Sequence, residues 1–416
     1  MAPRPQKNLP PPIDAERQLP ADLVLEIIAR SDPVTLIRSA AACRLLRRDI
    51  LDPSFIRRVT QGGIVPPCIL STINTNYRKD NLFPLLSLIH PAIPAVESFF
   101  DDHMSLVKSP DLGDLLREYY LVACRGGLVL LRASHVHLPV LCVYDPITGH
   151  RTFLQSEAPG IPNSNISFRK CALLTAADNI GCSFLLFVGD LNMGISNSDA
   201  HTIKVQTFRS STGAWEPVAT HDGFFMEQWQ EIGHYDTPVV LYGGIIHWLL
   251  CKDGKILTYD VCVAKPGMLE LPFLGRDISN FSAEQLQLRS YTSSDGHMLL
   301  RLLSTVGSTI SIWHQLSGGG WALDTVIEKE AELRSLGPNV HPGRPLQMMF
   351  MSSGERSSAV LLQINLPCHG VEKSFCFRFV LLDFERKEMH MIKEWRGTWI
   401  MEIDLPSRLR AMKIFS

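Results

Sequence analysis

The sequence lacks the short motifs that mark most enzymes and metal sites. Its ten cysteines include no C-x-x-C pair, which is the spacing typical of structural zinc sites. It also has no G-x-S-x-G elbow, no H-E-x-x-H and no glycine-rich loop of the kind that binds phosphate. We therefore predict that the protein is not an enzyme and that it uses no metal and no cofactor.

Charge of one sign and long apolar runs are also scarce. The net charge is −2, which gives no electrostatic reason to expect nucleic acid or an anionic membrane as a partner. The longest uncharged apolar stretch runs from Pro238 to Cys251, and it is shorter than the roughly 20 residues that span a bilayer. We therefore predict no nucleic-acid partner and no membrane partner.

The first residues point to a location inside the cell. Residues 1–17 are rich in proline and have no apolar run of the kind that a secretory signal needs, so we predict a disordered leader. Cys142 and Cys376 lie inside strand-like runs, where we expect reduced, buried thiols. Together these features predict a cytoplasmic protein, a nuclear protein or both.

Residues 18–60 carry three helix-start signals within a short span. Pro20 suits a first helical turn, because its missing N–H would have no partner there. Asp32-Pro33 and Asp52-Pro53 each combine a carboxylate that can accept free N–H groups with a proline that fixes φ. Helices are therefore predicted to begin near residues 33 and 53.

The same span holds more apolar residues than so short a segment can bury. Domains of about 40 residues rarely fold without a partner, a metal or disulfides, so a permanent partner is expected. The stretch from Leu19 to Val59 resembles an F-box, the helical motif that binds a Skp-type adaptor in cullin-RING ubiquitin ligases. The resemblance rests on the Leu-Pro opening, the Asp-Pro-Val start, the Ala-Ala-x-Cys-Arg junction and the Asp-Pro-x-Phe end.

The resemblance implies a set of adaptor contacts. The predicted contact residues are apolar and lie in the first part of the motif: Leu19, Pro20, Leu23, Ile27, Ile28, Leu36, Ile37 and Leu46. Leu45 and Leu46 stand where the family often has a tryptophan, which keeps the position apolar but smaller. The alternative interpretation is an ordinary helical cap on the larger domain.

From about residue 118 onward, short β-rich runs alternate with polar turns and repeat internally. The run that begins at Arg125 can be aligned with the run that begins at Tyr242, because both contain Gly-Gly, a strand, a turn and a second strand that ends in Tyr-Asp. The segment Asp-Pro-Ile-Thr-Gly at 145–149 predicts a hairpin turn, since proline presets φ and glycine accepts a positive φ.

Such repeats predict a β-propeller over residues 118–416. The repeats resemble kelch-type blades, and the region is similar to the F-box-associated propeller domains of plants. With about 50 residues a blade, we expect six blades. Residues 61–117 are interpreted as a connecting segment that could form part of the first blade. The predicted fold is thus α+β and multidomain, with a small all-α F-box before an all-β, kelch-like propeller.

Other residues are weighed as possible sites. Phe224, Phe225 and Trp229 fall in a loop-like span that mixes bulky aromatic and polar residues, so they are candidates for a substrate-binding face, although an amphipathic strand or helix that covers a blade is the slightly favoured interpretation. His135 and His137 have strand spacing and could share a metal, but two solvent-facing histidines on a hairpin are the simpler interpretation.

The resemblance implies a substrate-receptor subunit of a Skp-cullin-F-box E3 ubiquitin ligase. Its partners would be a Skp-type adaptor, through it a cullin, and a target protein that the sequence does not identify. The main alternative is a propeller that binds a glycan or small ligand outside any ligase. A third possibility is an enzyme whose catalytic groups come from different blades.

Overall fold

The computed structural model describes most of the chain between residues 19 and 412. The described residues are 19–31, 33–61, 68–73, 115, 118–133, 140–154, 158–159, 169–190, 201–224, 238–241, 243–250, 254–272, 282–292, 295, 297–336, 341, 343–355, 357–367, 375–392, 399–403 and 405–412. The chain divides into two compact units, Met1–Ile64 and Val65–Ser416.

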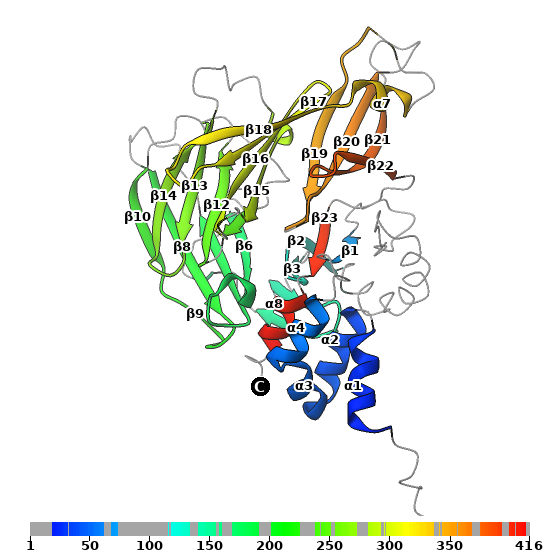
Figure 1. Cartoon of the computed structure of the whole chain (residues 1–416). Coiled ribbons are helices and arrows are strands. Elements are labelled where there is room, and N and C mark those ends of the chain that lie inside the picture. The colour runs from blue at the N-terminus through cyan, green and yellow to red at the C-terminus, as the bar shows by residue number, and fades with distance from the viewer. Residues whose placement is uncertain are drawn as a thin grey trace, which may run out of the picture. The chain divides into compact units, whose positions relative to one another are not determined.

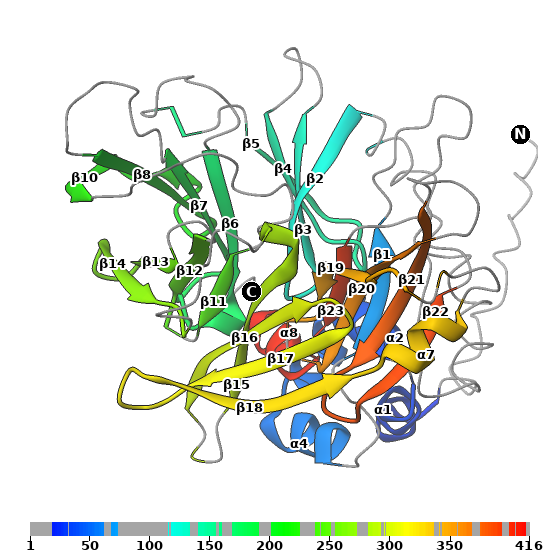
Figure 2. The same ribbon diagram turned by 90° about the horizontal axis from the view of Figure 1, so that it is seen from above.

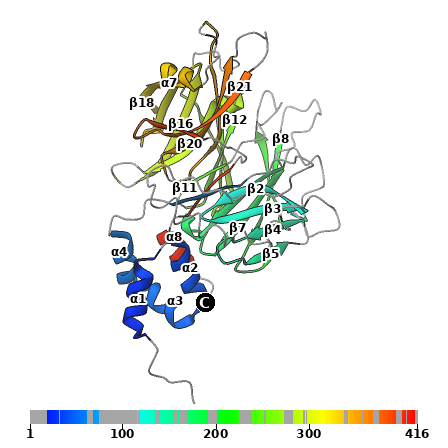
Figure 3. The same cartoon turned by 90° about the vertical axis from the view of Figure 1, so that its right-hand side faces the viewer.

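The first unit is a module of four short helices (Figures 1 and 3). They are α1 (Ala21–Ala29), α2 (Pro33–Ala42), α3 (Arg44–Ile50) and α4 (Pro53–Gln61). The predicted starts at Pro33 and Pro53 are confirmed. At the second start the Asp52 carboxylate accepts the backbone N–H of Ser54 at 2.8 Å, as the sequence predicts for a residue that caps a helix.

The second helix of the module ends on a side-chain cap. Arg47 of α3 donates from Nε to the carbonyl of Ala40 at 2.8 Å and from Nη2 to the carbonyl of Ala41 at 3.0 Å. These carbonyls lie in the last turn of α2, where no helical N–H remains to pair with them. Arg47 thereby fixes the sharp junction between α2 and α3.

The second unit is a β-propeller whose sheets surround a central region (Figure 2). Blade 1 consists of β2 (Tyr119–Arg125), β3 (Leu128–Ala133), β4 (Leu141–Tyr144) and β5 (Arg151–Leu154). Blade 2 consists of β6 (Arg169–Thr175), β7 (Phe184–Asp190), β8 (His201–Arg209), β9 (Ala214–Trp215) and β10 (Ala219–Phe224). Blade 3 consists of β11 (Val239–Leu241), β12 (Ile245–Leu250), β13 (Lys255–Asp260) and β14 (Lys265–Glu270).

Two further blades follow. Blade 4 consists of β15 (Leu286–Thr292), β16 (Met298–Val306), β17 (Thr309–Gln315) and β18 (Trp321–Glu328). Blade 5 consists of β19 (Gln347–Ser353), β20 (Ala359–Pro367), β21 (Phe375–Asp383) and β22 (Glu388–Ile392). Within each described blade, paired strands are antiparallel. Contacts between neighbouring blades are made by their first strands, which lie side by side in the pairs β2 and β6, β11 and β15, and β15 and β19.

A two-stranded sheet accompanies the five blades. It pairs β1 (Cys68–Ile73), which precedes blade 1 in the chain, with β23 (Trp399–Ile403), which follows blade 5. Strand β23 contacts both β2 of blade 1 and β19 of blade 5. The pairing of β1 with β23 therefore joins the two ends of the propeller chain, at a position next to both the first blade and the last.

Short helices complete the second unit. They are η3 (Ala176–Asp178) after β6, η5 (Ala283–Gln285) before β15, α7 (Glu330–Ser335) after β18 and α8 (Leu405–Met412) after β23. Helix α8 packs against η3, and its Leu405 and Leu409 are buried. Arg408 of α8 forms a buried ion pair with Asp145, in the turn between β4 and β5.

The core is divided into layers between neighbouring blades. One layer lies between blades 2 and 3, where the ring of Phe187 is 5.1 Å from that of Trp248 and 5.0 Å from that of Tyr259. Similar apolar layers join blades 1 and 2, blades 3 and 4, and blades 4 and 5. Trp248 is a buried residue of this layer.

Two sequence predictions need correction. The structure has five blades rather than six, because two of the repeats are longer than a 50-residue kelch unit: β6 and β11 begin 70 residues apart (239 − 169), and β15 and β19 begin 61 residues apart (347 − 286). Cys376 is exposed and disulfide-bonded, so the prediction of a reduced, buried thiol is wrong for this residue. It is correct for Cys142, Cys171 and Cys182, which are buried free thiols.

Candidate functional site

The helical module presents a row of apolar side chains to solvent. Leu23 and Ile27 of α1 are four residues apart, so they share one side of the helix, and Leu19 lies in the chain just before the helix. Their exposed fractions are 49%, 58% and 59% respectively. We call Leu19, Leu23 and Ile27 the α1 stripe. Exposed leucine and isoleucine side chains at this spacing are typical of a surface that another protein covers.

The structure separates the predicted adaptor contacts into two groups. Leu19, Pro20, Leu23 and Ile27 are exposed, so a partner can reach them. The others are buried or half-buried: Ile28, Leu36 and Ile37 are buried and Leu46 is half-buried. The first three of these contribute to packing instead of offering contact area. A pattern of apolar residues cannot separate these roles, because both kinds recur at helical spacing.

The module also exposes one large apolar residue that was not among the predicted contacts. Leu45 in the first turn of α3 is 66% exposed. In sequence it was noted only as a replacement for the family tryptophan. Leu45 directly follows the Ala-Ala-x-Cys-Arg junction, and this position was the signal that could have added it to the predicted adaptor contacts.

The candidate substrate-face aromatics lie at the edge of what the structure describes. Phe224 is the last residue of β10, the outermost strand of blade 2. The side chain of Phe224, and all of Phe225 and Trp229, lie outside the described residues, as do His135 and His137. Their assignment stays a prediction.

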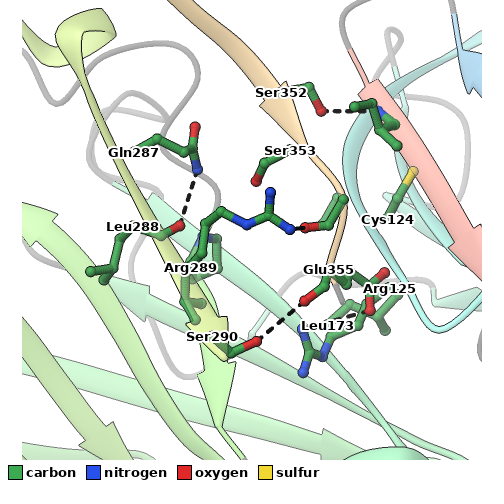
Figure 4. A pocket seen from close by; sticks show the side chains of 15 residues that line it. Cys124, Arg125, Leu173, Gln287, Leu288, Arg289, Ser290, Ser352, Ser353 and Glu355 are labelled. Atoms are coloured by element: carbon green, nitrogen blue, oxygen red, sulfur yellow. Dashed lines mark hydrogen bonds and ion pairs between the residues drawn. The ribbon is translucent and has the colours of Figure 1, made fainter. Parts of the chain in front are cut away.

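The centre of the propeller contains a polar cavity of about 60 Å³ (Figure 4). Its walls come from the first strands of all five blades and from β23, and they include Arg125, Arg289 and Glu355. None of these three was singled out from sequence, since they are far apart in the chain and belong to no motif.

Arg125 joins three blades. From β2 of blade 1 it donates to the Asp178 carboxylate through Nε at 2.9 Å and Nη2 at 2.5 Å, and Nη2 also donates to the carbonyl of Val240 in blade 3 at 3.0 Å. Burial favours the neutral guanidine, but the charge and hydrogen bonds of Asp178 outweigh it and raise the pKa of Arg125. Asp178 is itself fixed, because it accepts the N–H of Thr175 at 2.8 Å.

Glu355 links blade 5 to blade 1. From the turn after β19, its two carboxylate oxygens accept the N–H of Gly126 at 2.9 and 3.1 Å, and Oε2 lies 3.8 Å from Nη1 of Arg125. Burial raises the pKa of Glu355 to about 7, and the nearby carboxylates of Glu402 and Asp178 add to the rise while Arg125 opposes it. We call these contacts the Glu355 clasp.

Arg289 holds a second buried positive charge in the wall of the cavity, close to Glu355. It is 3% exposed, and its guanidinium donates to the carbonyls of Ala359 at 2.9 Å, Gly354 at 2.5 Å and Ser357. Its Nε has no hydrogen-bond partner among the residues that the structure describes. Burial lowers the pKa of Arg289 to about 10, with Glu402 opposing the shift.

The cavity is too small for a typical ligand. Pockets that bind drug-sized molecules have volumes of roughly 300 to 1,000 Å³, whereas a cavity of about 60 Å³ holds only a few water molecules or a small ion. The interactions of Arg125, Glu355 and Arg289 connect blades across the centre. We therefore interpret this polar cluster as structural, and it gives no support to a glycan site at this position.

Comparison with known proteins identifies the family. A model of the family described as "Domain of unknown function (DUF7595)" matches residues 107–415, which is well over half of the 416 residues. The chain belongs to this family. The match to the DUF7595 domain covers the five blades, and it begins after the four helices of the N-terminal module.

Solved structures are similar to the DUF7595 propeller only at a distance. Virginiamycin B lyase from Staphylococcus aureus is 9% identical, with 67% of this chain and 85% of that chain covered and a TM-score of 0.31. A protein from Lactobacillus plantarum is 12% identical, with 68% and 87% covered and a TM-score of 0.35. The GH43 protein BlXynB from Bacillus licheniformis is 12% identical, with 70% and 57% covered and a TM-score of 0.32. No curated protein matches the chain.

The described residues lack two further kinds of feature. Within these ranges, no three His, Cys, Asp or Glu side chains come together in a way that could hold a metal ion. No described helix has the length and apolar character needed to cross a bilayer.

Proposed function

We propose that this protein is a substrate-receptor subunit of a Skp-cullin-F-box ubiquitin ligase. The helical module binds a Skp-type adaptor and through it a cullin, and the DUF7595 propeller binds the target protein. The exposed α1 stripe is the observation that carries the proposal, because Leu19, Leu23 and Ile27 leave apolar area uncovered in a module that has few residues with which to cover it.

The energetics of the α1 stripe suit a stable partner. Burying one leucine or isoleucine side chain completely contributes about 1.5 to 3 kcal/mol. The three side chains are each about half exposed, so covering them provides several kcal/mol toward binding before the cost of association is subtracted. Leu45 adds to this area.

In this proposal the chain makes and breaks no covalent bond. It raises the effective concentration of the target near the ubiquitin-transfer subunits, which replaces a bimolecular encounter with a local one. A cytoplasmic or nuclear location follows from the same proposal, since adaptor and cullin act there.

The test is co-purification of the full chain with a Skp-type adaptor. The double variant Leu23→Asp, Ile27→Asp places two charges on the stripe, and we expect adaptor binding to fall at least 100-fold because each carboxylate would have to be desolvated at the interface. Affinity is measured by isothermal titration calorimetry with purified adaptor.

A matched control uses exposed apolar residues of the propeller. Val263→Asp, Val306→Asp introduces the same charges at side chains that are 66% and 62% exposed. It should bind the adaptor as the wild type does, and both double variants should melt at the wild-type temperature. Undiminished adaptor binding by Leu23→Asp, Ile27→Asp would refute the proposal, as would the absence of binding by the wild type.

A further inference from the structure

The outermost strands of the five blades differ in how their free edges are protected. An uncovered edge strand can pair with another chain, and proteins usually prevent this with short strands, proline, lysine or bulges. Strand β5 has 4 residues, β22 has 5, β14 begins Lys-Pro-Gly, and β10 has an irregular register between His221 and Phe224. Each of these four edges therefore carries at least one protective feature.

Strand β18 of blade 4 also has a bulge, because Asp324 has no residue opposite it on β17, but the strand is otherwise the least protected of the five. It is the longest of the five outer strands at 8 residues, and its sequence WALDTVIE contains no proline, glycine, lysine or arginine. Among the described strands it pairs only with β17, so its other edge is unpaired in that part of the chain (Figure 2, yellow). The edge best suited to pairing with another chain is thus the edge of blade 4.

A bulge in β18 gathers apolar side chains on one face. The register shift leaves Leu323 opposite Trp313 and Val326 opposite Ser311, and residues directly opposite each other point to the same face. Since positions 311 and 313 share a face, Leu323 and Val326 share it as well. They are 49% and 44% exposed.

Exposed apolar residues are concentrated in this blade. Eight large apolar side chains of the described propeller residues are exposed, and four of them belong to blade 4 or the turn that precedes β18: Val306, Leu316, Leu323 and Val326. The other four are distributed over three blades. Leu323 and Val326 lie on β18 itself, whereas Val306 and Leu316 lie at opposite ends of the blade.

The charges on β18 have one sign. Asp324 and Glu328 are exposed, and neither forms an ion pair with any described residue. The nearest basic residue in sequence, Lys329, is already paired with Glu332 at 2.6 Å. An extended segment lying along β18 would therefore meet two apolar side chains flanked by two unneutralised carboxylates.

We propose that β18 is the docking edge for an extended segment of the target protein, which adds to blade 4 as a further strand. The complementary segment has apolar residues that contact Leu323 and Val326 and lysine or arginine residues beside Asp324 and Glu328. Main-chain hydrogen bonds supply affinity in this mode, and the side chains supply specificity. The inference rests on the proposed receptor function, since it assigns the target-binding surface of that receptor.

The experiment is selection of a displayed library of random 12-residue peptides against the immobilised full chain. We expect the enriched peptides to alternate apolar residues with lysine or arginine. Val326→Lys should weaken the binding of an enriched peptide at least 10-fold, measured by fluorescence anisotropy. Bound peptide should also slow amide hydrogen exchange over Thr325–Glu328.

Two controls sharpen the result. Met391→Lys changes an exposed apolar residue on the outer strand of blade 5 and should leave affinity unchanged. Glu328→Lys should lose binding to the basic peptide and regain it when glutamate replaces the peptide's basic residues. Enrichment of acidic peptides, no enrichment, or equal binding by Val326→Lys would overturn the proposal.

Other outcomes identify a different occupant or separate the two proposals. If sedimentation shows that the wild type dimerises and that Leu323→Lys prevents it, the edge belongs to a second copy of the chain and the target-segment proposal fails. Adaptor binding should be the same in Val326→Lys and the wild type. If the adaptor never binds but the peptide result holds, the receptor function fails while the docking edge stands.

Discussion

The propeller contains buried ion pairs, whereas the ion pairs of the described helical module are largely exposed. In the module, Glu26 pairs with Arg30 at 2.8 Å and with Arg58 at 3.2 Å, and all three side chains are at least 42% exposed. In the propeller, the ion pair of Arg408 with Asp145 has side chains only 7% exposed. Surface pairs contribute little, whereas breaking a buried pair leaves an unpaired charge and is costly.

The two units also differ in how they treat apolar area. The propeller buries it in layers between blades, and polar contacts such as the Glu355 clasp connect the blades across the centre. The module leaves the α1 stripe in solvent. The described propeller therefore has apolar layers between its blades, while part of the module's apolar area stays accessible to the adaptor that we propose.

The largest effect is expected from removing the buried ion pair of Arg408 with Asp145. Arg408→Ala leaves the Asp145 carboxylate buried without its charge partner, and we expect the free energy of unfolding to fall by about 3 to 5 kcal/mol. Arg386→Ala is the control, because Arg386 is 65% exposed and its pair with Asp383 should contribute less than about 1 kcal/mol. Urea denaturation of the full chain measures both, and equal losses would contradict the contrast.

A pH dependence should follow from Glu355. Its pKa rises from an ordinary value of 4.5 to about 7 on folding, so its contribution to stability is fully present below pH 4.5 and is lost as the pH rises through 7. Between these limits the loss is roughly 3 kcal/mol, at about 1.4 kcal/mol for each pKa unit.

Glu355→Gln keeps an acceptor for the Gly126 N–H but does not ionise. The difference in free energy of unfolding between the wild type and this variant should therefore shift by that amount from pH 4.5 to pH 8. Chemical denaturation across this range gives the result, and a difference that does not change with pH would disprove the assigned pKa.

The smallest effect is expected in the module. Glu26→Gln removes the shared partner of Arg30 and Arg58 and should destabilise α1 by about 0.2 to 1 kcal/mol, less at high salt. Amide hydrogen exchange of α1 in the full chain, at low and high ionic strength, is the measurement. A larger loss that salt does not reduce would mean that the module depends on its charged pairs as the propeller does.

Local signals in the sequence predicted local structure well. Asp-Pro steps located the starts of α2 and α4, and the Asp-Pro-Ile-Thr-Gly turn lies between β4 and β5 as expected. In that turn Asp145 accepts the N–H of Ile147 at 3.0 Å, and Gly149 has a φ of +74°. The repeat from Arg125 corresponds to β3–β5 and the repeat from Tyr242 to β12–β14.

Contacts between distant segments could not be predicted in this way. Arg125 and Asp178 are 53 residues apart, and Gly126 and Glu355 are 229 apart, so no spacing rule connects them. The pairing of β1 with β23 was missed for the same reason, because the segment was assigned to a connection or to blade 1. The sequence also could not tell which predicted adaptor contacts are exposed and which are buried, because the exposure of a side chain depends on tertiary packing.

The pairing of β1 with β23 has a practical consequence for protein expression. The family match begins at residue 107, so a fragment cut to that boundary would lose Cys68–Ile73 and leave β23 without its neighbour. A bare strand of this kind invites aggregation. The compact unit begins at Val65 instead, and recombinant work on the isolated propeller should start there.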